Sequence, residues 1–264
     1  MRSVFQWSIM LWNLFFFISC SQEANVEEEK PSGLIERSMS SAMWKAASIE
    51  TYEKKVQEIV ATNQSVLAKR DTSKPLLLIL GSSSSGGGTR GNNMKFWPEI
   101  LRRDLSKVHV QSLARGGATT WHMRKAVEGL DIKADICILY MGYNDRQEKS
   151  PKQSIAQLEQ GLIPKKDGFV AWVSPKEQKE NIFGIQKYCA NFLLVREYVQ
   201  GQKLRNDPYV EVFQTVQNTR YFDPTSMFRK EDPKIVMMDN IHPTPFGHQL
   251  LAQAIQKEIQ DWLP

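Results

Sequence analysis

The chain has 264 residues, of which 41% are hydrophobic, 24% charged and 10% aromatic, and its formal net charge is +5. This composition provides enough apolar mass for one sizeable core and excludes a disordered, collagen-like or multi-pass membrane protein. The 34 Lys and Arg residues are scattered among 29 Asp and Glu residues rather than gathered into a basic stripe, so we expect no nucleic-acid partner.

The first 19 residues predict a signal peptide. Arg2 is the only charged residue before Cys20, and the apolar run over residues 8–18 is shorter than the roughly 20 residues that cross a membrane. The run ends in Phe17-Ile18-Ser19-Cys20, which resembles the lipobox of bacterial lipoproteins, where the cysteine is lipidated. We therefore expect an exported lipoprotein, anchored in the cell envelope through Cys20. An ordinary secretory signal, giving a secreted or periplasmic protein, and an uncleaved anchor remain alternatives.

Residues 21–33 are polar and acidic, with almost no apolar side chains. Such a segment buries too little apolar surface to offset its ordering entropy, so we predict a flexible tether over residues 20–40. Two or more acyl chains on Cys20 would hold that tether at a membrane surface without a transmembrane helix. From about residue 40 onward there is no internal repeat and no second linker, which predicts one domain over residues 41–264.

The chain contains three cysteines, namely Cys20, Cys137 and Cys189. They are too few for a disulfide scaffold and allow at most one disulfide bond. Their spacing matches neither a CxxC pattern nor a Cys/His zinc site, so we expect no bound metal.

The rest of the sequence alternates between helical and strand-like patterns. Residues 46–69 carry apolar side chains at helical spacing, and residues 76–80 form an apolar run closed by Gly81, as in a strand buried on both faces. The pattern predicts further helices over residues 93–106, 120–130, 151–160, 177–200 and 245–262, and strands over residues 108–113, 134–141, 169–173 and 209–213. Strands separated by helices indicate an α/β fold, a three-layer α/β/α sandwich with a five-stranded, mainly parallel, flavodoxin-like sheet.

Candidate site residues should follow the strands, because ligands bind at the carboxyl ends of the strands in such sheets. After the first strand, Gly81 is followed by four serines, Ser82 to Ser85, and then by three glycines. A tight turn of this kind can expose a serine hydroxyl beside backbone N–H groups. The segment lacks the lysine of a P-loop and the glycine spacing of a dinucleotide-binding loop. It indicates either a serine nucleophile or a flexible or phosphate-binding loop.

Two later strand ends carry hydrogen-bond donors. Gly116 and Gly117 follow the second strand, where a glycine can present an unobstructed backbone N–H, and Asn144 follows the third strand with a side-chain amide. Both groups are components of an oxyanion hole. Glycine, asparagine and aspartate are also the commonest turn formers, so each signal taken alone is more typical of a simple turn.

Asp239 and His242 lie three residues apart, just before the final predicted helix. An aspartate in this position can accept the imidazole Nδ1–H and leave Nε2 free to take a proton from a serine. His109 falls inside a predicted strand, and His122 and His248 fall in predicted helices, where a structural role is more common. Taken alone, His242 also fits a structural role.

These four motifs, in this order at successive element ends, resemble the SGNH hydrolase family, also called GDSL esterases and lipases, over about residues 75–260. The family's first block is Gly-Asp-Ser-x-x-x-Gly, and aligning it on Gly81 and Gly87 places the nucleophile at Ser83. The remaining blocks fall on Gly117, on Gly142–Asp145 and on Asp239–Pro243.

Two positions depart from the family pattern. Ser82 stands where the first block has aspartate, and Ser112 or its neighbours stand where the second block usually has asparagine. Because the first block here contains four consecutive serines, Ser82 and Ser84 remain alternative nucleophiles. Neither departure removes a triad or oxyanion group.

The resemblance implies a serine esterase in which Asp239 orients His242 and His242 deprotonates Ser83, so that an acyl-enzyme forms and water hydrolyses it. It also implies an oxyanion hole made of the N–H groups of Ser83 and Gly117 and the side-chain amide of Asn144. No metal or organic cofactor is needed for this chemistry. We expect a monomer that acts on a small-molecule, polysaccharide or lipid ester.

Two other functions fit the same residues. An O-acyltransferase would pass the acyl group to a sugar hydroxyl instead of to water, and a non-catalytic surface lipoprotein would keep the fold as a binding module. The presence of all five implied site residues argues against the binding module, which has no use for the complete set.

Overall fold

The computed structural model describes residues 49–86, 95–146, 173–200 and 208–264. The predicted signal peptide, Cys20, the tether over residues 20–40 and the predicted helix over residues 151–160 lie outside these ranges. Within them, no helix combines the length and the apolar character that a membrane span requires.

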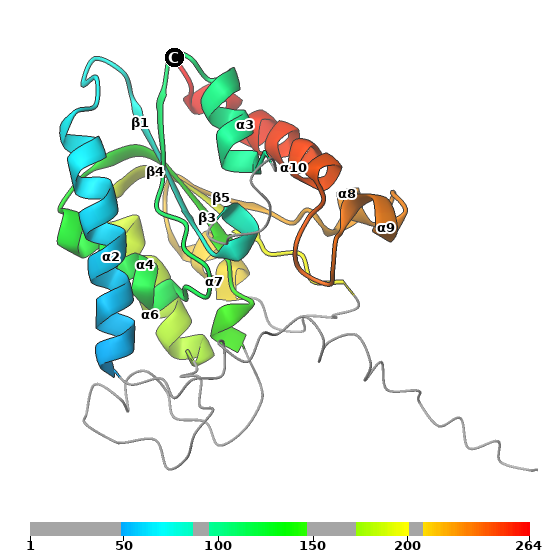
Figure 1. Cartoon of the computed structure of the whole chain (residues 1–264), viewed down its shortest axis with the longest axis horizontal. Coiled ribbons are helices and arrows are strands. Elements are labelled where there is room, and N and C mark those ends of the chain that lie inside the picture. Colours follow the sequence, from blue (N-terminus) through cyan, green and yellow to red (C-terminus); the bar gives the residue numbers. More distant parts are fainter. Residues whose placement is uncertain (1–48, 87–94, 147–172, 201–207) are drawn as a thin grey trace, which may run out of the picture.

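A five-stranded sheet forms the centre of the described structure (Figure 1). Its strands are β1 (Leu76–Gly81), β2 (His109–Ser112), β3 (Ala134–Met141), β4 (Cys189–Arg196) and β5 (Thr219–Phe222). They are arranged in the order β2-β1-β3-β4-β5, and every neighbouring pair is parallel. This order is that of the flavodoxin-like sheets and confirms the predicted fold class.

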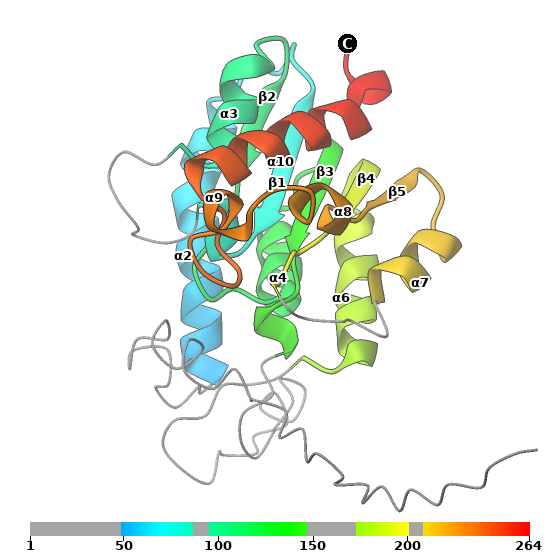
Figure 2. The same ribbon diagram turned by 90° about the vertical axis from the view of Figure 1, so that its right-hand side faces the viewer.

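Helices cover both faces of the sheet, as Figure 2 shows from the side. One face carries α2 (Ile49–Ala68), α4 (Thr120–Leu130), α6 (Pro175–Gln186) and α7 (Pro208–Thr215). The other carries α3 (Trp97–Asp104) and α10 (Pro245–Glu258), together with the short helices α8 (Thr225–Phe228) and α9 (Pro233–Val236). The result is the predicted three-layer sandwich.

The apolar side chains of β1 enter two different cores, one on each face of the sheet. Successive side chains of a strand point to opposite faces, and here Leu76, Leu78 and Leu80 enter the core beneath α2 and α4. Leu77 and Ile79 enter the opposite core, against α3 and α10. A strand covered on both faces therefore has no position for a polar side chain, which is why its sequence reads as an unbroken apolar run.

Two predicted elements in the second half of the chain are wrong. The predicted helix over residues 177–200 is α6 followed by β4, because the apolar residues 192–195 are buried as a central strand. The predicted strand over residues 209–213 is the helix α7, in which Tyr209 and Val212, three residues apart, face the core together. Periodicity alone cannot separate strand from helix in apolar runs this short. Of the predicted strand over residues 169–173, only Val173 is described, and it lies outside any strand.

Cys137 and Cys189 form a disulfide bond between the neighbouring strands β3 and β4, with their Cα atoms 5.6 Å apart. The bond lies in the core on the side of α4 and α6. It is the one disulfide that the cysteine count allowed, and its half-cystines are among the residues that the sheet buries.

Candidate active site

The turn after β1 brings a serine to the carboxyl edge of the sheet. Gly81 ends the strand, and residues Ser82–Ser85, here called the serine turn, continue into one turn of 3₁₀ helix. A side chain on Gly81 would place its Cβ 2.3 Å from Ser85 Oγ, so only glycine allows this close approach. Ser83 is half-buried, whereas Ser82, Ser84 and Ser85 are buried.

Ser83, His242 and Asp239 form a chain of hydrogen bonds. Ser83 Oγ lies 2.9 Å from Nε2 of His242, and Nδ1 of the same ring lies 2.9 and 2.8 Å from the two carboxylate oxygens of Asp239. Because Asp239 accepts a hydrogen bond from Nδ1–H, the proton of the neutral ring stays on Nδ1 and Nε2 is left as the acceptor for the Ser83 hydroxyl. The structure thus brings together the three residues that the sequence nominated from loops 159 residues apart.

The loop before α10 fixes the position of this aspartate and histidine. Asp239 Oδ1 accepts backbone hydrogen bonds from Ile241 (2.9 Å) and His242 (2.8 Å), which turn its carboxylate back toward the imidazole. The N–H of Met238 donates to the carbonyl of His242 at 2.8 Å and closes the loop. These contacts explain why an aspartate three residues before the histidine reaches its ring.

The two alternative nucleophiles have other partners. Ser82 Oγ donates to Glu197 Oε1 at 3.1 Å, and Ser84 Oγ donates to the same oxygen at 2.9 Å. Ser85 Oγ has no hydrogen-bond partner among the described residues. Of the serine turn, it is Ser83 whose hydroxyl faces His242.

The proposed oxyanion donors Gly117 and Asn144 lie on two loops that are bonded to each other. Asn144 Nδ2 donates to the carbonyl of Ala118 at 2.9 Å, next to Gly117, whose φ of +68° is in the left-handed region. The N–H of Arg115 donates to the carbonyl of Gly81 at 3.2 Å. This bond joins the loop that contains Gly117 to the base of the serine turn, so the loops after β1, β2 and β3 meet at one edge of the sheet.

Lys55 of α2 supports the loop after β2, a contact that the sequence reasoning missed. Its Nζ donates to the carbonyls of Gly116 (3.4 Å) and Gly117 (3.3 Å). Burial, followed by the nearby charge of Arg115, lowers the pKa of Lys55, while Glu58 acts in the opposite direction. Helical spacing predicts which residues of this helix face the core, but it contains no information about a lysine that reaches a distant loop.

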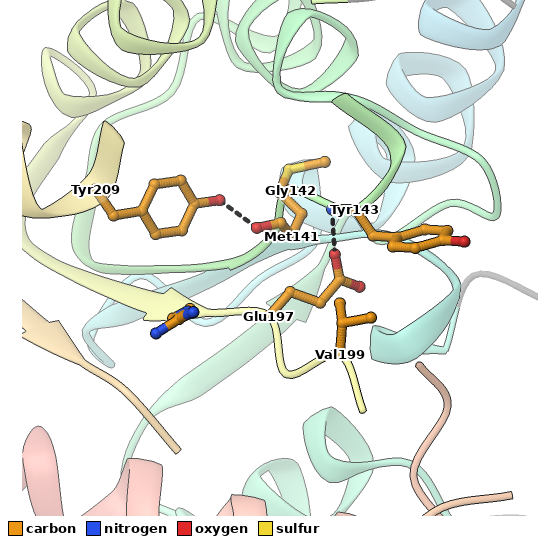
Figure 3. A pocket seen from close by; sticks show the side chains of 7 residues that line it. Met141, Gly142, Tyr143, Glu197, Val199 and Tyr209 are labelled. Carbon is orange, nitrogen blue, oxygen red and sulfur yellow. Dashed lines mark hydrogen bonds between the residues drawn. The ribbon is translucent and has the colours of Figure 1, made fainter. Parts of the chain in front are cut away.

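Glu197, at the end of β4, is the second residue that the sequence reasoning missed. It is buried, and besides the two serine hydroxyls it accepts the backbone N–H of Tyr143 at 2.8 Å (Figure 3). Burial raises the pKa of Glu197, and the hydrogen bonds from Tyr143, Ser84 and Ser82 lower it. The available signal was an acidic residue two positions after an apolar run, but the predicted helix over residues 177–200 concealed that strand end.

A small pocket opens beside Glu197, between the ends of β3 and β4 (Figure 3). Its lining consists of Met141, Gly142, Tyr143, Arg196, Glu197, Val199 and Tyr209. The hydroxyl of Tyr209 donates to the carbonyl of Met141, which fixes one wall. In the described ranges of the chain, no group of His, Cys, Asp and Glu side chains is arranged to hold a metal ion.

His248, one turn into α10, gives the fold a dependence on pH. Its ring is buried 5.0 Å from the ring of Phe96, and neither ring nitrogen has a hydrogen-bond partner in the described part of the chain. Burial, with a smaller contribution from His242, lowers the pKa of His248 from its usual 6.5 to about 4. The ring is therefore neutral in the folded protein at neutral pH.

We expect the free energy of unfolding to fall as the pH falls from about 6.5 to about 4. In this window the unfolded chain binds a proton on His248 that the folded chain does not, and below it both states are protonated. The lowered pKa of His248 corresponds to a decrease of about 3 kcal/mol in the free energy of unfolding across this window. Urea unfolding at pH 7 and pH 4.5 should show a smaller loss of stability for His248→Leu than for the wild type. An equal loss in both proteins would contradict this assignment.

Comparison with protein families matches residues 79–250 to the GDSL-like Lipase/Acylhydrolase family. The matched range includes Ser83, Gly117, Asn144, Asp239 and His242. A search of curated proteins gave no match.

Solved structures share the fold. LAE5, an alpha/beta hydrolase enzyme from the metagenome of Lake Arreo, Spain, is 17% identical, with a TM-score of 0.52 over 74% of this chain and 99% of its own. A catalytic mutant of Axe2, an acetylxylan esterase from Geobacillus stearothermophilus, is also 17% identical, with a TM-score of 0.51 over 73% of this chain and 97% of its own. At this identity, the likeness shows a common architecture.

Proposed function

Because the chain belongs to the GDSL-like lipase/acylhydrolase family and is an ester-hydrolysing enzyme, we propose that it acts as a serine esterase with Ser83 as its nucleophile. The observation that carries this proposal is the 2.9 Å contact between Ser83 Oγ and His242 Nε2. On the other side of the ring, Asp239 lies 2.8 Å from Nδ1 and holds the tautomer in which Nε2 is the base.

In the acylation step, Ser83 Oγ bonds to the ester carbonyl carbon while Nε2 of His242 takes the hydroxyl proton. The carbonyl electron pair moves onto oxygen, and its return expels the alcohol, which leaves with the proton from Nε2. In the second step, His242 takes a proton from water, and the resulting hydroxide attacks the acyl-enzyme. Collapse releases the carboxylic acid and returns the proton to Ser83. Asp239 stabilises the imidazolium in both steps.

The oxyanion of each tetrahedral intermediate is held, in this proposal, by the backbone N–H groups of Ser83 and Gly117 and by the Asn144 amide. Two contacts support it: Asn144 Nδ2 donates to the carbonyl of Ala118, and the N–H of Arg115 donates to the carbonyl of Gly81. Donors held in place before the reaction need no rearrangement when charge develops on the oxygen.

We propose a short acyl ester of a carbohydrate as the substrate class. The support is the fold shared with Axe2, an acetylxylan esterase, over 73% of this chain. A carbohydrate ester also agrees with the envelope location that residues 1–20 predict. Transfer of the acyl group to a sugar hydroxyl would use the same acyl-enzyme.

The test compares hydrolysis of p-nitrophenyl acetate, butyrate and octanoate, and release of acetate from acetylated xylo-oligosaccharides. We expect the acetyl esters to be the best substrates and His242→Ala to be inactive on all of them. His109→Ala is the matched control, because His109 begins β2 at the opposite end of the sheet. A folded wild-type protein that hydrolyses none of these esters would contradict the esterase proposal, and octanoate as the best substrate would contradict the substrate class.

A further inference from the structure

A buried carboxylate outside the Ser-His-Asp group faces the serine turn. Only 5% of Glu197 is exposed, and its two oxygens accept hydrogen bonds from Ser82 Oγ, Ser84 Oγ and the N–H of Tyr143. All three partners are donors, so the site satisfies an ionised carboxylate. A protonated carboxyl would lose the charge assistance of these hydrogen bonds, and one serine hydroxyl would have to turn and accept from it instead of donating.

Glu197 connects the ends of three strands. Ser82 and Ser84 follow β1, Tyr143 follows β3, and Glu197 itself follows β4. Ser84 Oγ also lies 3.2 Å from the carbonyl of Ile241, the residue before His242. Glu197 therefore lies at the centre of hydrogen bonds that connect the serine turn with the loop of Asn144 and, through Ser84, with the loop that contains His242.

The position of this carboxylate complements a departure in the sequence. The family's first block has an aspartate directly before its nucleophile, and this chain has Ser82 there. In the structure, the Ser82 hydroxyl donates to the carboxylate of Glu197, a residue 115 positions later in the chain. A carboxylate, which the first block itself lacks, therefore lies within hydrogen-bond distance of Ser82 at the end of β4.

We propose that Glu197 is a positioning residue that replaces the first-block aspartate: it holds the hydroxyls of Ser82 and Ser84 so that Ser83 presents its own to His242. This role rests on the proposed esterase function. The charges of Glu197 and His242 interact across this site, so the negative charge of Glu197 also favours the imidazolium that forms on His242 during acylation.

Glu197→Gln tests the charge and the hydrogen bonds with little change in shape. The amide replaces one carboxylate oxygen with an NH₂ group, which cannot accept the hydrogen bonds that this oxygen receives, so we expect kcat on p-nitrophenyl acetate to fall about 100-fold, with little change in KM. Without the negative charge, the imidazolium is less stable, so the acid limb of the kcat/KM profile should move to lower pH. Glu197→Asp keeps the charge and should recover part of kcat and the wild-type acid limb.

Asp135→Asn is the matched control for this experiment. Its carboxylate also accepts a backbone N–H, that of Leu76 at 2.7 Å, but it lies at the amino end of the sheet. We expect it to keep the wild-type kcat and pH profile. Near-UV circular dichroism of each variant establishes that the fold is intact.

A rescue experiment tests the replacement itself. Ser82→Asp restores the family's aspartate, and in the Glu197→Ala background it should recover at least ten-fold of the lost kcat, about 1.4 kcal/mol. Ser82→Asp alone should lower kcat, because it places two carboxylates in one buried site. If Glu197→Ala does not fold, the same comparison is made with Glu197→Gln.

The outcomes separate this inference from the esterase proposal. If the wild type hydrolyses esters and Glu197→Gln matches its kcat and pH profile, the positioning role is wrong while the esterase proposal stands. A Glu197→Gln variant that loses kcat with an unshifted acid limb and no rescue by Ser82→Asp would also overturn the role. A wild type inert on every ester would contradict the esterase proposal instead.

Discussion

Replacing Ser83 with alanine is expected to lower kcat on p-nitrophenyl acetate by about 10⁶-fold, the scale on which loss of a serine nucleophile acts in triad enzymes. The reason is geometric: of the hydroxyls in the serine turn, that of Ser83 lies 2.9 Å from His242 Nε2. Residual turnover should come from the oxyanion donors and substrate binding alone. Initial rates over a range of substrate concentration give kcat and KM separately.

The serine turn supplies its own control. Ser85→Ala makes the same chemical change two residues away, at a hydroxyl that has no hydrogen-bond partner among the described residues, and should leave kcat near the wild-type value. Labelling with a fluorophosphonate, followed by mass spectrometry of the labelled peptide, identifies the modified serine. A label on Ser82 or Ser84, or an active Ser83→Ala protein, would move the nucleophile to another position.

Asn144→Ala should give the second-largest effect, a fall in kcat of roughly 100- to 1000-fold with little change in KM. The side chain donates to the carbonyl of Ala118 through one amide hydrogen, and the same group has a second hydrogen for the oxyanion. Asn144→Asp keeps the shape and should be the more damaging change, because its negative charge opposes the charge that develops on the substrate oxygen. Both kcat values come from the same acetate assay.

A loss of stability must be separated from this loss of catalysis. The hydrogen bond to Ala118 is worth about 1 kcal/mol, so urea unfolding of Asn144→Ala should show only a small decrease in the free energy of unfolding. Turnover within about three-fold of the wild type would contradict the oxyanion assignment. A fall in kcat that tracks a large loss of folded protein would do the same.

The parts of the fold that sequence predicted well are those in which one local pattern decides the outcome. The apolar residues of β1 and β3 are buried on both faces, and the bounds of α4 and β3 agree with the prediction. The rule that ligands bind at strand ends then pointed to the serine turn and Asn144, and the family's first block placed the nucleophile at Ser83 within that turn. The spacing of Asp239 to His242 predicted the remaining pair. Here the information lies within a few consecutive residues.

The remaining features depend on residues far apart in the chain. β4 was predicted as part of a helix because its four-residue apolar core fits either period, and only its partners β3 and β5 decide between them. Glu197 could not be connected to Ser82, 115 residues earlier, without the sheet order. Lys55 of α2 reaches Gly117, and the apolar spacing of the helix does not describe which distant loop a lysine side chain contacts.

The disulfide between Cys137 and Cys189 closes a loop of chain, and some of the proposed catalytic groups lie inside this loop while the others lie outside it. The bond closes a covalent ring of chain that contains Asn144 and α6, while Ser83, Asp239 and His242 lie on the two free arms outside it. For a sequence separation of 52, the chain-entropy account gives the ring about 4 kcal/mol of stabilisation, through the freedom that the unfolded chain loses. If a peptide bond between residues 138 and 188 is cut, the disulfide still joins the two fragments. Ser83 on the first fragment therefore stays covalently linked to Asp239 and His242 on the second.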